Sequence, residues 1–308
     1  MSASFRIGVD ENGLGARLGP MVVTAVLARV DPGGARLLSR KLPKRIAELI
    51  GDSKQRVSHD DVALGEAWAR ALVDPEAPCP QAVFGRLSLE GVERLAVPCP
   101  EHVHAQCWSS HGESFSAEHQ LVADALRVRA ELAARGVDVL SVKSSVICTE
   151  RLNAALAAGK NRFVADLHAM ESLVLAHRAQ AQADVVAICG KVGGMADYSR
   201  FFGPLGGRLH VVLEQRRAHS AYRFPGLGEL HFVRDADASD ALVMLASLVG
   251  KWVRELLMAR VARWYDDAGA PSGYHDPVTA RFVEATALVR QGRRVPDTCF
   301  ERVRARDE

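Results

Sequence analysis

The stretch RIGVDENGLGARLGP near the N-terminus places two adjacent carboxylates at the end of a short apolar run and follows them with three glycines. Asp10 and Glu11 cost desolvation free energy at the end of a strand unless a partner balances their charge. Gly13, Gly15 and Gly19 imply that the backbone turns tightly or approaches another group closely. Acidic side chains beside bare backbone favour a site that holds a metal ion and a phosphate group together.

A second group of acids, in VRDADASDALVML, precedes the longest apolar segment of the chain. Asp237 stands just before a helix expected over residues 239–265, with Asp235 and Asp240 close by. One interpretation is that Asp237 or Asp240 caps this helix, although Ser239 competes for that role. The other is a two-magnesium phosphodiesterase site, because hard cations take oxygen ligands and two of them stabilise the attacking and leaving oxygens.

The elements that must position these acids can be predicted from apolar patterning. Residues 5–10 and 20–30 have the β-branched, apolar character of strands, and the short glycine-rich segment between them favours an antiparallel hairpin. Helical patterns occupy residues 35–50, 58–73, 116–136, 161–181 and 239–265, and further strands are expected at 82–89, 184–190 and 209–215. The sequence pattern of residues 269–308 predicts one more helix within a loop-rich tail.

Together these elements predict an α/β protein. We expect one domain over residues 1–265, with an irregular insertion rich in Cys, His and Pro over 75–115, and a helical and loop extension over 266–308.

The composition, 48% hydrophobic and 25% charged over 308 residues, fits a globular protein with a sizeable core. No apolar run reaches the roughly 18 residues of a membrane span. The N-terminus lacks a charged segment followed by an apolar one, so a cytoplasmic location is expected. The net charge of +2 does not by itself indicate nucleic-acid binding.

Six cysteines are too scattered for a disulfide framework in a chain of this length. The segment CPEHVHAQCWSSH nevertheless gathers potential zinc ligands, although its spacing matches no standard pairing of CxxC type. The alternative is an irregular loop with reduced thiols. The residues in question are Cys79, Cys99, His102, His104, Cys107 and His111.

Several motifs, in order along the chain, resemble the type 2 ribonuclease H family, the bacterial ribonucleases HII and HIII. GVDENGLGARLGPMVVTAV resembles the family's opening, in which a first strand ends in Asp-Glu and Gly-x-Gly and Gly-Pro follow. GDSK, ICTERLNAALAAGKNRFVADLHAMESLV, DADASDALVMLASLVGKWVRELLM and SGYHDP are similar to later segments of that family. The resemblance covers roughly residues 6–300.

The resemblance implies an RNase H-like fold, with a mixed central sheet flanked by helices. It implies cleavage of the RNA strand of RNA–DNA hybrids, or of duplexes containing ribonucleotides, with Mg²⁺ or Mn²⁺ in a two-metal site. Asp10 and Glu11 match the first two catalytic, metal-binding acids, and Asp237 matches the fourth. We expect a monomer with no membrane association.

Substrate contacts are implied in the same way. Ser53 and Lys54 match residues near substrate phosphates, and Tyr274 matches a tyrosine that stacks near the RNA–DNA junction. The backbone of Gly13, Leu14 and Gly15 would then inspect the ribose 2′-hydroxyl, the group that separates RNA from DNA.

The sequence departs from the family at the third acid, where Cys189 stands. A thiol is a poor ligand for a hard cation, and Lys191 adds positive charge nearby. Leu14 replaces a basic residue between the two glycines, and Asp235 replaces a lysine before the last acid. Asp240, about one turn beyond Asp237, and Asp197, after Cys189, are candidate substitute acids.

Two functions therefore stay open. One is a metal-dependent endoribonuclease, with activity weakened by the cysteine at the third-acid position. The other is a catalytically impaired RNase H-like domain that binds nucleic acid or a partner. A third alternative is a module stabilised by zinc on Cys99, His102 and Cys107.

Overall fold

The computed structural model describes residues 4–51, 61–96, 108–192, 195–265 and 271–303. A mixed seven-stranded sheet in the order β3-β2-β1-β4-β7-β6-β5 forms its centre. The strands are β1 Ser4–Asn12, β2 Met21–Val30, β3 Val137–Ile147, β4 Val185–Gly190, β5 Val211–Gln215, β6 His219–Phe224 and β7 Gly228–Val233.

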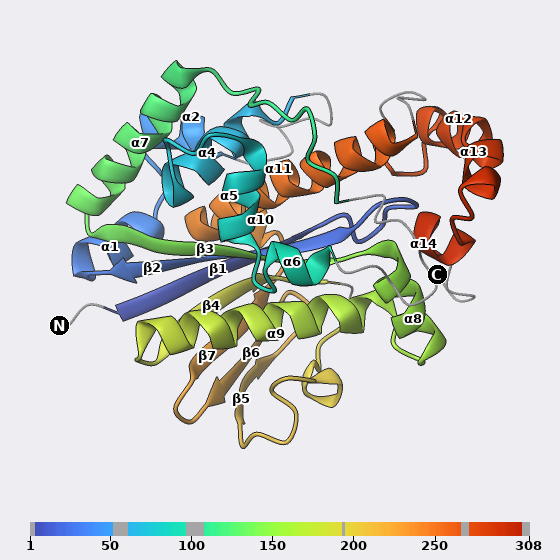
Figure 1. The fold of residues 1–308 in the computed structure, drawn as a ribbon. Helices are drawn as coiled ribbons and strands as arrows, with labels where there is room; N and C mark the ends of the chain where they lie inside the picture. Colours follow the sequence, from blue (N-terminus) through green and yellow to red (C-terminus); the bar gives the residue numbers. More distant parts are fainter. Residues whose placement is uncertain (1–3, 52–60, 97–107, 193–194, 266–270, 304–308) are drawn as a thin grey trace.

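Helices cover both faces of the sheet. In Figure 1 the sheet lies between α11 (Ala241–Trp264) above and α9 (Arg162–Ala181) below. The core on the α11 side also includes α4 (Ala63–Val73), α5 (Pro80–Leu87) and α7 (His119–Ala134). The remaining helices are α1 Pro32–Leu38, α2 Lys44–Leu49, α6 Val92–Leu95, α8 Thr149–Ala157, α10 Ala236–Ser239, α12 Pro277–Ala285, α13 Ala287–Gly292 and α14 Asp297–Phe300, with a 3₁₀ turn at Ser199–Phe201.

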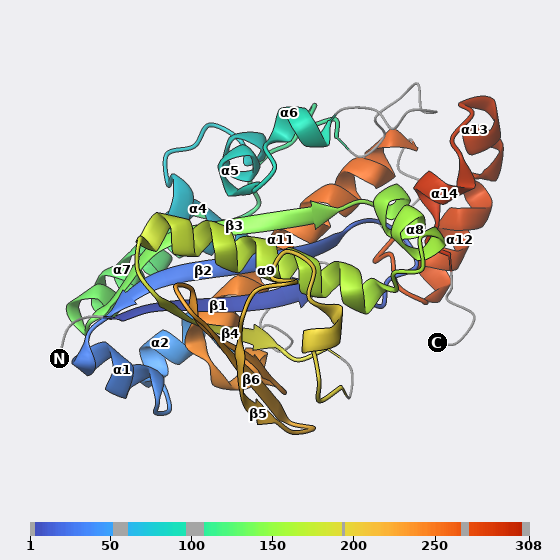
Figure 2. The same cartoon turned by 90° about the horizontal axis from the view of Figure 1, so that it is seen from below.

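The predicted N-terminal hairpin is confirmed. Strands β1 and β2 pair antiparallel, with Asp10 opposite Thr24, and β1 also pairs in parallel with β4, with Val9 opposite Cys189. The carboxyl ends of β1 and β4 therefore meet at the same edge of the sheet. Asp10, Glu11 and Cys189 lie at this edge. Figure 2 shows β1 beside β4.

Other local predictions were wrong in identifiable ways. Residues 82–89, expected as a strand, lie mostly in α5, because Pro80 occupies the first helical turn and Val83, Phe84 and Leu87 bury one helical face. The single helix expected over 35–50 is two helices, α1 and α2, separated by a segment that contains Pro43. Strands β3, β6 and β7 were not anticipated.

The C-terminal region contains three short helices, α12 to α14, where one helix was expected. They pack on the far end of α11 through a small core that also includes Leu18 of the glycine-rich loop. The α/β class, with a mixed sheet flanked by helices and a helical C-terminal region, is confirmed. Within the described ranges, no helix combines the length and apolar character that crossing a membrane requires.

Candidate active site

A cleft of about 560 Å³ opens at the carboxyl end of β1. The residues that line this cleft come from the end of β1 and the glycine-rich loop, from α10 and α11, and from the segment around Tyr274. The cleft brings together most of the residues that the sequence analysis proposed: Asp10, Glu11, Gly13, Leu14, Gly15, Asp237 and Tyr274.

Asp10 lies at the centre of the acidic group. Ser247 of α11 hydrogen-bonds its side chain, and a Cβ atom added to Gly190 would lie 3.0 Å from its Oδ1. Burial of the carboxyl group, reinforced by repulsion from Glu11 and Asp237, raises the pKa of Asp10 to about 8 against the lowering effect of Ser247. The charges of Glu11 and of Asp237 therefore both act on Asp10.

Glu11 and Asp237 reach the cleft from different elements. Oε2 of Glu11 accepts a hydrogen bond of 3.2 Å from the backbone N–H of Leu14, which ties the carboxylate to the loop. Asp237 lies in α10, which begins after Asp235 in a left-handed conformation with φ of 53°. Carboxylates from a strand end and a helix thus face a common space, as the sequence pattern predicted.

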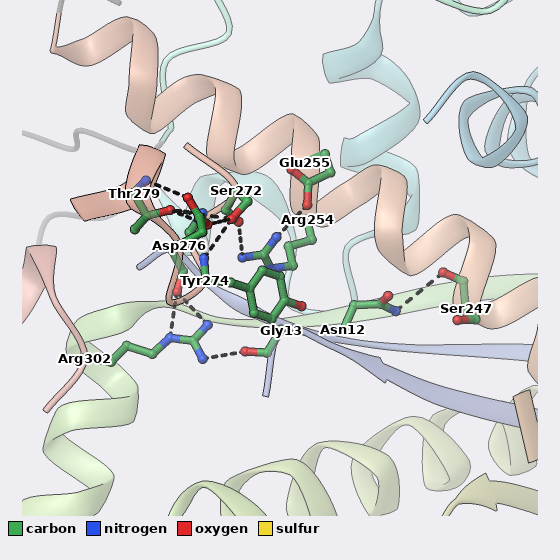
Figure 3. Close-up of polar contacts among 12 residues, drawn as sticks. Asn12, Gly13, Ser247, Arg254, Glu255, Ser272, Tyr274, Asp276, Thr279 and Arg302 are labelled. Atoms are coloured by element: carbon green, nitrogen blue, oxygen red, sulfur yellow. Dashed lines mark hydrogen bonds and ion pairs between the residues drawn. The ribbon is translucent and has the colours of Figure 1, made fainter. Parts of the chain in front are cut away.

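The glycine-rich loop leaves its backbone accessible where it faces the cleft. Gly13 has φ of 91°, and an added Cβ would lie 2.5 Å from Nε of Arg254, so a side chain there is excluded. Gly15 is exposed, and an added Cβ there would contact nothing within 4 Å. The guanidinium group of Arg302 donates hydrogen bonds to the carbonyl oxygens of two residues of this loop. One is Gly13, as Figure 3 shows, and the other is Gly19.

Tyr274 presents an aromatic ring to the cleft, with 42% of the residue exposed. The guanidinium carbon of Arg254 lies 4.6 Å from its ring centroid, in a cation–π arrangement. Nη2 of Arg254 also donates to the carbonyl of Ser272 at 2.8 Å, which joins α11 to the Tyr274 segment (Figure 3). The ring is therefore held in place with one side available.

Four basic side chains line the same cleft, Lys191, Arg234, Lys251 and Arg254. The ammonium group of Lys191 donates to the carbonyl of Arg216 at 2.8 Å and to Oγ of Ser220 at 2.7 Å. These contacts direct the charge of Lys191 toward β6 and its preceding turn. The cleft as a whole is lined by five acidic side chains, Asp10, Glu11, Asp235, Asp237 and Glu255, and by these four basic ones.

Cys189 does not line the cleft; it is buried on the face of the sheet covered by α9. Burial first, and the charge of Asp166 second, raise the pKa of its thiol well above the ordinary value. A neutral buried thiol offers no hard oxygen ligand.

Neither of the two candidate substitute acids lines the cleft. Asp240 caps α11, where Oδ1 accepts hydrogen bonds from the backbone N–H groups of Leu242 and Val243 at 2.9 and 3.1 Å. This is the capping interpretation, with Asp240 as the N-cap residue. Asp197 instead binds Ser199 at 2.6 Å and Arg200 at 3.0 Å. Each of the two carboxylates thus accepts hydrogen bonds from backbone or side-chain groups of its own adjoining turn.

The structure reveals an acid that the sequence analysis missed, Asp166 of α9. Its residue is fully buried, and its pKa is raised well above the ordinary value by burial and then by the charges of Glu11 and Asp10. The available signal was an aspartate on the apolar stripe of a helix, at i, i+4 and i+7 with Met170 and Leu173. An acid on a core-facing stripe is unusual enough to examine.

A divalent metal ion fits this donor set. Among the described residues, no three Asp, Glu, His or Cys side chains form a ready-made ligand group around one point. The donors at the cleft are nevertheless carboxylates, which hard cations prefer. Both side-chain oxygens of Asp166 are buried, and neither has a hydrogen-bond partner in the described part of the chain. A bound cation would supply the interaction that these buried oxygens lack.

Some proposed residues cannot be placed. Ser53 and Lys54 lie outside the described residues, as do the potential zinc ligands Cys99, His102, His104 and Cys107. Of that cluster, Cys79 and His111 are described, and neither belongs to a metal-ligand group among the described residues.

No family model and no curated protein matches the chain. Among solved structures, ribonuclease HII of Archaeoglobus fulgidus, from its complex with PCNA, is 16% identical, with a TM-score of 0.44 and coverage of 99% of this chain and 97% of that one. Bst-RNase HIII in complex with Mn²⁺ is 15% identical, with a TM-score of 0.45 and coverage of 98% and 67%. Ribonuclease H2 of Pyrococcus horikoshii is 16% identical, with a TM-score of 0.41 and coverage of 96% and 95%. At these values, the functional assignment rests on the residues of the cleft.

Proposed function

We propose that this protein is a metal-dependent endoribonuclease that cleaves the RNA strand of RNA–DNA hybrids. The observation that carries the proposal is the convergence of Asp10, Glu11 and Asp237 with the exposed Gly15 of the glycine-rich loop in one cleft. Acids alone would serve many hydrolases. Acids beside an accessible glycine backbone, an aromatic ring and cationic walls suit a nucleic-acid backbone that carries a 2′-hydroxyl.

Asp10, Glu11 and Asp237 would hold Mg²⁺ or Mn²⁺. When bound, the metal supplies Lewis-acid stabilisation of charge on the phosphate and activation of water. The carboxyl group of Asp10, whose pKa is raised to about 8, would ionise in order to hold such a cation. The hydrogen bond from Leu14 to Glu11 keeps the glycine loop in register with the acids.

The other residues of the cleft would bind and orient the duplex. The backbone of Gly15 is open to a ribose hydroxyl, because no side chain occupies the space beside it. Tyr274 offers a stacking surface, and Arg254, at 4.6 Å from its ring and paired with Glu255, holds that surface in place. Lys251 and Arg234 supply further positive charge toward phosphates.

A second candidate function is binding without cleavage. It is favoured by the buried thiol of Cys189, which leaves the third-acid position without an oxygen ligand, and by Leu14 in place of a basic residue. Under this alternative the cationic walls and Tyr274 retain nucleic acid, and the acids no longer support hydrolysis.

The experiment that separates the two is cleavage of a labelled RNA–DNA hybrid and of a duplex with a single ribonucleotide, in Mg²⁺ and in Mn²⁺. Cleavage supports the endoribonuclease. Salt-sensitive hybrid binding by folded protein without any cleavage supports the binding function. The comparison of the two substrates also defines which of them the cleft prefers.

A further inference from the structure

Asp166 lies on the face of α9 that packs against the sheet. Its exposed fraction is 0%, and it shares that face with Met170 and Leu173, which belong to the core beneath the helix. One turn earlier, Nη1 of Arg162 lies 3.4 Å from the carbonyl of Leu14, so the start of α9 lies beside the glycine-rich loop that follows β1. Asp166 is not among the residues that line the cleft, but its helix packs against both β1 and β4.

The environment of Asp166 differs from that of a second buried acid on the same helix. Glu171 is also 0% exposed, but its carboxylate accepts hydrogen bonds from the backbone N–H groups of Gly203, at 3.1 Å, and Leu205, at 2.7 Å. Neither oxygen of Asp166 has a hydrogen-bond partner among the described residues. Glu171 therefore has a structural role that is visible in its contacts, whereas Asp166 has none.

The neighbours of Asp166 are the acids of the cleft. Side chains alternate along a strand, so Glu11 points to the same sheet face as Ile7 and Val9, the face that α9 covers. Cys189 lies on this face too, directly opposite Val9 in the parallel pair. The charges acting on Asp166 are those of Glu11 and Asp10, and its own charge acts on Cys189.

We propose that Asp166 supplies the carboxylate that is missing at Cys189, so that the third acid of the metal site comes from helix α9 instead of the end of strand β4. This inference rests on the proposed function and names a further ligand of the same site. A buried carboxylate without donors is costly in the metal-free protein and becomes favourable once a cation is bound beside it. The acidic set is then Asp10, Glu11, Asp166 and Asp237.

The test compares Asp166→Asn with Glu171→Gln, which removes the other fully buried acid of the same helix. Mn²⁺ binding is measured by calorimetry, together with Mn²⁺-dependent cleavage of a labelled hybrid. We expect Asp166→Asn to weaken Mn²⁺ binding by about tenfold or more and to abolish cleavage. Glu171→Gln leaves Mn²⁺ affinity unchanged. The metal-free melting temperature of Asp166→Asn should stay close to that of the wild type, because an amide replaces a buried carboxyl group of the same shape that has no hydrogen-bond partner.

A relocation variant gives the sharpest outcome. Adding Cys189→Asp to Asp166→Asn returns an acid to the end of β4, and we expect it to restore Mn²⁺ affinity and measurable cleavage. Wild-type Mn²⁺ affinity and cleavage in Asp166→Asn would overturn the inference while leaving the proposed function intact. Absence of both Mn²⁺ binding and cleavage in the folded wild type would overturn the proposed function, and this inference with it.

Discussion

Nη1 of Arg302 donates a hydrogen bond of 2.5 Å to the carbonyl oxygen of Gly13, while Nη2 donates one of 2.7 Å to that of Gly19. A residue near the C-terminus thereby fixes both ends of the loop that follows Asp10 and Glu11. Burial, together with the nearby charges of Arg254 and Arg162, lowers the pKa of Arg302 to about 9. The guanidinium adds to the weaker bonds that these carbonyls accept from the backbone N–H of Ala16, at 3.3 Å, and from the hydroxyl of Thr149, at 3.2 Å.

Replacement of Arg302 by Met should loosen the glycine-rich loop. Removal of the buried guanidinium takes away the charged donor of both carbonyls and leaves Gly13 with the backbone N–H of Ala16 and Gly19 with the hydroxyl of Thr149, so we expect a loss of about 1–3 kcal/mol in the free energy of unfolding. Urea denaturation measures it. Arg29→Ala is the control. Arg29 pairs with Asp138, but the two side chains are 57% and 40% exposed, so this ion pair should contribute little to stability. Equal stability of the two variants would contradict the role of Arg302.

Tyr274→Ala should weaken hybrid binding by about tenfold, since base stacking on an aromatic side chain contributes on the order of 1–3 kcal/mol. Tyr274→Phe keeps the ring and should bind almost as the wild type does. Fluorescence anisotropy with a labelled hybrid measures both. Because Tyr274 is 42% exposed, neither change should lower the melting temperature appreciably. Weak binding by Tyr274→Phe would show that the ring is not a stacking surface.

The contribution of Asp10 to the stability of the metal-free protein should fall as the pH rises from about 4 to 8. The pKa of Asp10 is raised to about 8 in the folded state, so the folded state binds a proton more tightly than the unfolded chain does. Ionisation of the folded protein therefore costs stability over this interval. In EDTA, the melting temperature of Asp10→Asn should exceed that of the wild type by a margin that grows from pH 5 to pH 8. A margin independent of pH would contradict the assignment.

The sequence predicted those parts of the site that depend on local pattern. Asp10 and Glu11 end an apolar β-branched strand, and the glycines after them require a turn, so the hairpin and its accessible backbone follow from neighbouring residues. The strand expected at residues 82–89 failed for the opposite reason. Its β-forming residues, Val83 and Phe84, are spaced for a helix that Pro80 initiates, and tertiary packing selected the helix.

Contacts between distant segments could not be predicted in the same way. Cys189 was identified as the position without an acid, but the neighbour that could compensate depends on how α9 crosses the sheet. Asp166 is 156 positions along the chain from Asp10, and its apolar stripe on α9 indicates only that it is buried. Likewise, the contact between Arg302 and Gly13 joins the two ends of the chain and has no local sequence signal.

The most direct test of the proposed function is the rate of RNA-strand cleavage in a labelled hybrid with Mn²⁺, measured for the wild type beside Asp10→Asn prepared identically. The charges of both Glu11 and Asp237 act on Asp10, so replacing its carboxylate with an amide should impair the whole metal site. We predict cleavage by the wild type and a loss of at least about a thousandfold in Asp10→Asn, as expected when several kcal/mol of transition-state stabilisation are removed. Equal cleavage by the two proteins, or none by the folded wild type, would contradict the proposal.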